Sequence, residues 1–230
     1  MKYEELKLDL ARLLSLPALE HDPFVMAQAD RAIGLAHNDV ALALRTPART
    51  IQVTPSSTGV ATWPTEAFAG RDGVQYAYVK TNNRTRNLLV LTEIEAYNRF
   101  PNWESLQGES KFIIIDPSNS SAGIRFVPYA SATGTTYHIR YVKIPSVLDS
   151  PNDIPLDGEL PQYHPLISLR AAILMLEYDY AGGETADYIG FTNIRKYEAL
   201  QRQYQARLIE AQRAVLPQTV LVRNPFWSIE

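Results

Sequence analysis

The segment from Leu160 to Gly183 constrains the fold of this chain most, because it is the most apolar continuous segment of helical length. Its apolar side chains recur at steps of three and four residues, the spacing of one helix face. The first stripe contains Leu166, Leu169, Ile173, Leu176 and Tyr180, and a second stripe beside it contains Ile167, Ala171, Leu174 and Tyr178. A helix that is apolar on two faces must be covered on two sides, either inside a large core or between this chain and a neighbouring copy. We therefore predict that this helix is the centre of the fold.

The ends of this helix are also marked in the sequence. Pro161 and Pro165 suit its entrance and first turn, where a missing backbone N–H costs little. Gly182 and Gly183 can adopt the left-handed conformation that ends a helix.

The composition excludes several classes of protein. With 230 residues and 46% apolar side chains, the chain can bury a sizeable interior. A net charge of −3 and a pI near 5.9 argue against tight electrostatic binding of nucleic acid. The absence of cysteine excludes disulfides, zinc–thiolate sites and cysteine nucleophiles. The N-terminus lacks the features of a secretory signal, and no charge-free apolar run reaches about twenty residues, so no membrane span or membrane partner is expected.

Periodicity predicts the other elements. Amphipathic helices are expected over Tyr3–Leu16, over Asp22–Leu44, and from Thr185 or Thr192 to Val215. Short strands are expected at Thr50–Thr54, Val74–Lys80, Phe112–Ile115, Ile124–Val127 and Thr136–Lys143. A capping box at Thr92–Glu95 begins a short helix that Pro101 ends.

These elements predict an α+β fold. Two N-terminal and two C-terminal helices form a helical bundle, and the β-rich segment between them forms an inserted domain like a sandwich or small barrel. The expected boundaries are 1–45 for the N-terminal helices, 46–148 for the β-rich insertion, 149–216 for the C-terminal helices and 217–230 for an extended tail.

For the polar residues that could bind a metal, act in catalysis or contact nucleic acid, we favour a structural role over a functional one. The four histidines, His21, His37, His138 and His164, lack metal-ligand spacing. Asp149, Asp153 and Asp157 are four residues apart, whereas an EF-hand loop needs ligands two apart. Glu93 and Glu95 are explained by helix capping, and Lys80, Arg84 and Arg86 form a basic loop without interleaved aromatics. We predict no catalytic residue, no cofactor and no metal site.

The order of features from Leu88 to Tyr180 resembles the head-to-tail adaptor (connector) proteins of short-tailed bacteriophages, in particular the SU10-type adaptor family. The resemblance rests on Leu91–Tyr97 before Phe100-Pro101, on Gly108, and on the strand that ends at Ile115-Asp116-Pro117. It continues through Arg125–Tyr129, Tyr137–Tyr141, Ile154-Pro155 and Leu160–His164.

The resemblance implies a virion structural protein, assembled in the host cytoplasm, that is located in the neck between head and tail. Its subunits would form a homo-oligomeric ring of twelve copies that binds the portal protein above and a downstream tail or nozzle protein below, and double-stranded DNA would pass through the channel. The portal-binding tail would include Val220, Val222, Pro225, Phe226 and Trp227. The subunit interface would include Leu166, Ile167, Leu169, Ile173, Leu174, Leu176, Tyr180, Tyr197, Tyr204 and Leu208.

Two other functions remain open from the residues alone. Thirteen tyrosines and three tryptophans also suit a β-rich receptor- or carbohydrate-binding module on a helical mount. A hydrolase acting on cell-wall glycan would need a pair of carboxylates in a cleft, and their separation cannot be read from sequence.

Overall fold

The computed structural model describes residues 1–16, 23–81, 84–106, 108–116, 123–128, 135–181 and 186–215, with the side chains of 81, 84, 178–181 and 186–193 left out. The described residues form an α+β fold, as predicted. They divide into two compact units, a helical unit of residues 1–44 and 145–230 and a β unit of residues 45–144.

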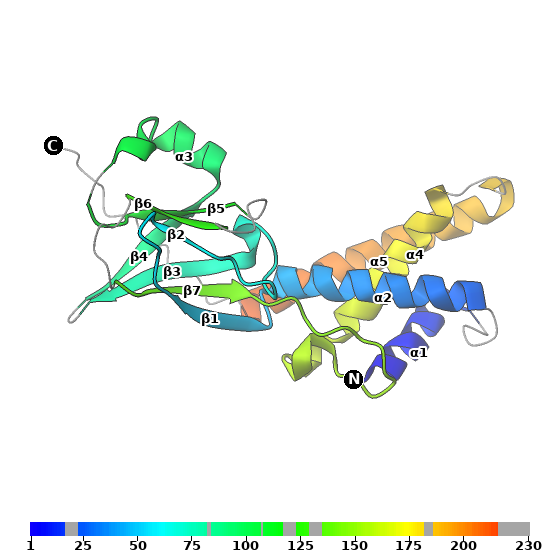
Figure 1. The fold of residues 1–230 in the computed structure, drawn as a ribbon. Coiled ribbons are helices and arrows are strands. Elements are labelled where there is room, and N and C mark those ends of the chain that lie inside the picture. Colours follow the sequence, from blue (N-terminus) through cyan, green and yellow to red (C-terminus); the bar gives the residue numbers. More distant parts are fainter. Residues whose placement is uncertain are drawn as a thin grey trace. The chain divides into compact units, whose positions relative to one another are not determined.

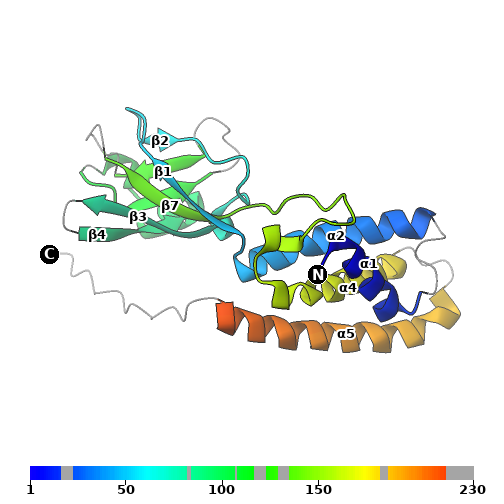
Figure 2. The ribbon, with the colours of Figure 1, turned by 90° about the horizontal axis from the view of Figure 1, so that it is seen from below.

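The helical unit contains four long helices. They are α1 (Tyr3–Leu14), α2 (Pro23–Leu44), α4 (Pro165–Ala181) and α5 (Ala186–Val215). Helix α4 packs against α1, α2 and α5, and Figure 2 shows it running between α2 and α5. Helix α4 begins at Pro165, so the predicted start of this central helix is confirmed. A proline fits the first helical position because no hydrogen bond is lost there.

A loop with two short 3-10 helices, η3 (Pro155–Gly158) and η4 (Pro161–Tyr163), leads into α4. Leu156, Asp157 and Leu160 have φ angles of 54°, 53° and 51° in this loop. Non-glycine residues adopt this left-handed conformation at an energetic cost, so surrounding contacts must hold them there.

The β unit contains one seven-stranded sheet in the order β1-β7-β3-β4-β5-β6-β2 (Figure 1). The strands are β1 (Ala48–Val53), β2 (Val60–Ala61), β3 (Val74–Thr81), β4 (Arg84–Leu91), β5 (Phe112–Ile115), β6 (Ile124–Val127) and β7 (Tyr137–Val142). Neighbouring strands are antiparallel except for β4 and β5, which are parallel.

The sheet curls into a half-barrel rather than forming the two packed sheets of a sandwich. Phe126 on β6 and Tyr137 on β7 lie with ring centroids 4.5 Å apart, although three strands separate β6 from β7 in the sheet. Such a contact requires the two strands to approach across the concave face. This face holds a core that also includes Val53, Ile113 and Ile139.

Helix α3 (Glu93–Arg99) covers part of the convex face. With η2 (Trp103–Ser105) it encloses a second core that includes Leu91, Phe112, Ile114 and Val127. The Thr92 hydroxyl accepts a hydrogen bond from the Glu95 backbone N–H, so the predicted capping box is confirmed. The 3-10 turn η1 (Arg71–Gly73) precedes β3.

The sequence prediction missed β4. The basic loop expected from Lys80 to Arg86 is shorter than predicted: Lys80, which also ended the expected strand Val74–Lys80, lies on β3, and Arg84 and Arg86 lie on β4, paired in register with β3. The first half of β4 is polar and lacks apolar alternation, and its pairing with β3 supplies the backbone hydrogen bonds that stabilise it there.

Candidate interaction surfaces

The residues predicted to form the subunit interface on α4 are mostly buried by the chain itself. Leu166, Ile167, Leu169, Ile173 and Leu176 are each 5% exposed or less. Leu174 is half-buried and lines a cavity of about 270 Å³ with Phe24, Leu35 and Met175.

The first apolar stripe of α4 is therefore covered where its side chains are described, whereas the second stripe remains partly open at Leu174. Ala171 on the second stripe has no exposed surface. The buried members of the predicted interface pack within the chain, and their role in a subunit interface stays a prediction. The Tyr178 and Tyr180 side chains lie outside the described residues.

One stripe of side chains on helix α5 packs against α4, and most other described side chains of α5 are exposed. Tyr204 is 8% exposed, Leu208 is half-buried, and the half-buried Tyr197 donates a hydrogen bond of 3.1 Å from its hydroxyl to Glu177 on α4. The Glu177 carboxylate accepts this bond and raises the pKa of the Tyr197 hydroxyl. These three predicted interface residues thus also serve packing within the chain.

The predicted portal-binding residues, Val220, Val222, Pro225, Phe226 and Trp227, lie outside the described residues. Their role stays a prediction.

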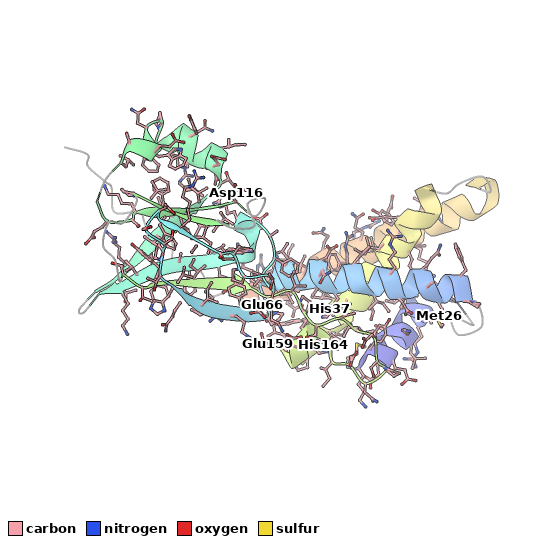
Figure 3. The ribbon with its side chains drawn as sticks, viewed as in Figure 1. Met26, His37, Glu66, Asp116, Glu159 and His164 are labelled. Atoms are coloured by element: carbon pink, nitrogen blue, oxygen red, sulfur yellow. The ribbon has the colours of Figure 1, made fainter. Side chains whose placement is uncertain are left out.

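Two buried histidines hold the loop before α4 in place. His37 on α2 is 3% exposed, and its Nε2 accepts a hydrogen bond of 2.8 Å from the backbone N–H of Leu156. His164 is fully buried next to it, with Nε2 3.0 Å from the Glu159 carbonyl oxygen (Figure 3). Burial lowers the pKa of His37 to about 4 and also lowers the pKa of His164. Both histidines are thus neutral at pH 7.

The candidate carboxylates also have local partners. The Asp153 carboxylate accepts hydrogen bonds from the backbone N–H groups of Asp149 and Ser150, and these bonds lower its pKa. Glu95 accepts from the Thr92 backbone N–H and pairs with Arg71, and its pKa is lowered mainly by the bond from Thr92. Among the described residues, no three His, Asp or Glu side chains gather as metal ligands would.

Helix α3 covers the end of β4 at Leu91, whereas the convex face of β1, β7, β3 and the preceding part of β4 presents a distinct surface. Cross-strand registers place ten outward side chains there, because residues opposite one another or two apart share a face. We call them the open sheet face: Thr50 and Gln52 on β1, His138 and Arg140 on β7, Tyr76, Tyr78 and Lys80 on β3, and Thr85, Asn87 and Leu89 on β4.

Aromatic rings run through the middle of the open sheet face. Tyr78 stacks on His138 with centroids 4.7 Å apart and planes 5° apart, and Tyr76 lies 6.0 Å from Tyr78. Tyr76 is 46% exposed, and the Arg140 Nε donates to the Gln75 side-chain oxygen at 2.9 Å. The strand expected at Thr136–Lys143 contains His138, but local sequence cannot group Tyr76 and Tyr78 with it, because this pairing joins segments about sixty residues apart.

The charges of the chain are divided between its two units. The β unit has 11 Lys and Arg against 7 Asp and Glu, a net +4, whereas the helical unit has 11 against 18, a net −7. The open sheet face carries Lys80 and Arg140 and contains no Asp or Glu.

The described residues define an α+β protein with a helical unit and a half-barrel β unit. A family model described as SU10 adaptor protein matches residues 1–222, so the chain belongs to the SU10 adaptor protein family. The predicted family is confirmed, and the match extends beyond the Leu88–Tyr180 resemblance to the N-terminal helices. No curated protein matches the chain.

Membership makes this a bacteriophage adaptor, a structural protein of a family that is not typically enzymatic, and a component of the virion. No helix in the described part of the chain is both long and apolar enough to span a membrane.

Proposed function

We propose that this adaptor forms a ring in the neck of the virion, joins the portal protein of the head to the next tail protein, and leaves a channel through which double-stranded DNA passes. The observation that carries the proposal is the family match over residues 1–222. A copy number of twelve is part of the same proposal.

The surface properties support an assembling protein. Large apolar side chains remain exposed on the helical unit, including Phe24 at 70% and Leu35 at 46%. Exposed apolar side chains that lie close together are typical of surfaces that associate. The subunit interface is therefore better sought on exposed residues than on the buried residues of α4.

The acidic helical unit, with its net charge of −7, also suits a channel for DNA. Phosphates are repelled by like charge, so DNA can slide past such a wall without being retained.

The test is assembly of the purified chain, alone and with portal protein, followed by electron microscopy and native mass spectrometry. We expect closed rings, formed by the chain alone or on contact with the portal. A chain that stays monomeric and shows no affinity for the portal would contradict the proposal.

The C-terminal tail gives a second test. We expect deletion of residues 218–230 to leave the melting temperature unchanged and to weaken co-sedimentation with the portal, because Val220, Val222, Phe226 and Trp227 would supply the apolar anchor. Loss of folding on truncation would instead show that the tail is part of the core.

A further inference from the structure

The open sheet face has the composition of a protein interface. Tyrosine and arginine are enriched in such interfaces and Asp and Glu are depleted, and this face combines Tyr76, Tyr78 and Arg140 with no carboxylate. Tyr76 and Leu89 are 46% and 42% exposed, so apolar area is available for burial by a partner. The missing negative charge favours a partner with an acidic surface.

The chain itself carries a surface with the complementary properties. Backbone hydrogen bonds join the start of α1 to the loop after the β unit, and both segments carry exposed apolar and acidic side chains: Glu4, Glu5 and Leu8 on α1, and Val147, Asp149 and Ile154 in the loop. We call this the acidic loop surface. Val147 is 81% exposed, Ile154 55% and Leu8 46%, so each leaves apolar area available for burial by a partner.

Backbone hydrogen bonds hold the acidic loop surface together. The Tyr3 N–H donates to the Asp153 carbonyl at 2.9 Å and the Glu4 N–H to the Pro151 carbonyl at 3.3 Å. Lys2 also lies here, but its Nζ donates to the Asn152 side chain at 2.8 Å. The N-terminal ammonium also lies here, 3.8 Å from the Glu5 carboxylate, so the three carboxylates of Glu4, Glu5 and Asp149 face two cations.

We propose that the open sheet face of one copy docks on the acidic loop surface of a neighbouring copy. Lys80 and Arg140 would face Glu4 and Asp149, and Tyr76 and Leu89 would pack on Val147 and Ile154. This inference rests on the proposed ring. Two unlike patches on one chain make a head-to-tail contact, which is the kind of contact that closes a cyclic ring.

Nucleic acid fits the open sheet face less well than a second copy does. The face has two full positive charges, and binding by counterion release depends on the number of phosphates neutralised, so two contacts give weak binding. A second copy supplies both the apolar contact and the carboxylates.

Cysteine cross-linking tests the contact directly, because the chain has no cysteine of its own. One batch carries Asn87→Cys and a second batch carries Val147→Cys; the two are mixed, assembled with portal protein, and treated with a short bis-maleimide. We expect a covalent dimer containing one chain of each kind. The matched control replaces Asn87→Cys by Asn98→Cys on α3, an exposed position outside the face, and should give no dimer.

Charge reversal supplies an independent readout. Lys80→Glu with Arg140→Glu should raise the concentration needed for half-assembly on the order of ten- to a hundredfold, since attraction becomes repulsion. Adding Glu4→Lys and Asp149→Lys to the same chain should restore assembly. Arg99→Glu together with Lys111→Glu changes the net charge of the β unit equally outside the open sheet face and should have little effect.

The outcomes separate the docking from the ring. Rings that form normally with the reversed charges, without the mixed dimer, would overturn the docking and leave the ring intact. Binding of a 20-nucleotide oligonucleotide or of heparin through Lys80, with assembly unchanged by Lys80→Glu, would also overturn the docking. A wild-type chain that never assembles, even with portal, would overturn both proposals. Because Arg140 bonds to Gln75, Lys80→Glu alone is the variant to use if the double change lowers the melting temperature.

Discussion

At the scale of single residues, His37 is the polar group on which the helical unit depends most clearly. It is neutral, almost fully buried, and its Nε2 accepts the backbone N–H of Leu156, a residue held at a φ of 54°. The titratable groups that act on the His37 ring are Asp157, whose carboxylate favours protonation of His37, and His164, which opposes it. Burial outweighs the carboxylate, so the folded chain resists protonation of His37.

This gives a pH dependence with a definite sign. His37 has a pKa of about 4 in the folded chain, against an ordinary value of 6.5, so the unfolded chain binds the proton more tightly. Neutral His37 therefore contributes about 3 kcal/mol to the free energy of unfolding. This contribution is fully present above pH 6.5 and is lost as the pH falls toward 4. Urea unfolding followed between pH 7 and pH 4 measures it.

The control for this prediction is His37→Gln, in which the amide oxygen can still accept the Leu156 N–H but does not titrate in this range. It should unfold with a weaker dependence on pH over the same interval. An identical dependence in the two chains would show that other groups cause the acid effect.

At the scale of elements, α4 is the core of its own unit. Ile173 is 1% exposed and lies between the other helices, so Ile173→Ala should lower the free energy of unfolding of the dissociated chain by about 2–5 kcal/mol. An interface residue would instead weaken assembly and leave the stability of the dissociated chain almost unchanged. Chemical denaturation at a concentration below assembly distinguishes the two.

The matched control is Val147→Ala, which also shortens an apolar side chain but at a position that is 81% exposed. Its effect on the unfolding free energy should stay within about 0.5 kcal/mol. If docking takes place at the acidic loop surface, the same change should weaken assembly, so the two variants should show opposite patterns.

At the scale of the whole molecule, the division of charge between units predicts a salt effect. Contacts between a unit of net +4 and one of net −7 weaken as salt screens them, and the screening length falls from about 10 Å at 0.1 M to about 3 Å at 1 M. The concentration for half-assembly should therefore rise by about tenfold between 0.05 and 0.5 M NaCl, as measured by sedimentation velocity. Assembly that strengthens with salt would indicate a purely apolar interface.

Much of the element pattern could be predicted from local sequence. Helix α2 begins at Pro23 and ends at Leu44, and β5 and β6 have the expected bounds, because these segments combine clear periodicity with proline or turn residues at their ends. Strand β4 was missed, because its polar first half becomes a strand only through pairing with β3.

The interaction surfaces depend on information that local sequence does not contain. Tyr76, Tyr78 and His138 form one aromatic column only because β3 pairs with β7, and Val147 and Glu4 share a surface only because the loop bonds to the start of α1. No spacing within one segment reveals either grouping.

The sequence by itself determined that this chain has an apolar central helix, a β-rich insertion and the ordered features of an adaptor family, because these follow from local periodicity and from the order of residues along the chain. Only the tertiary structure decided that α1, α2 and α5 cover this helix, that the sheet curls into a half-barrel, and that cations and aromatic rings share an open face. The physical reason is that burial and charge grouping depend on contacts between segments far apart in the chain, whereas helix and strand patterns depend on neighbours within a few residues.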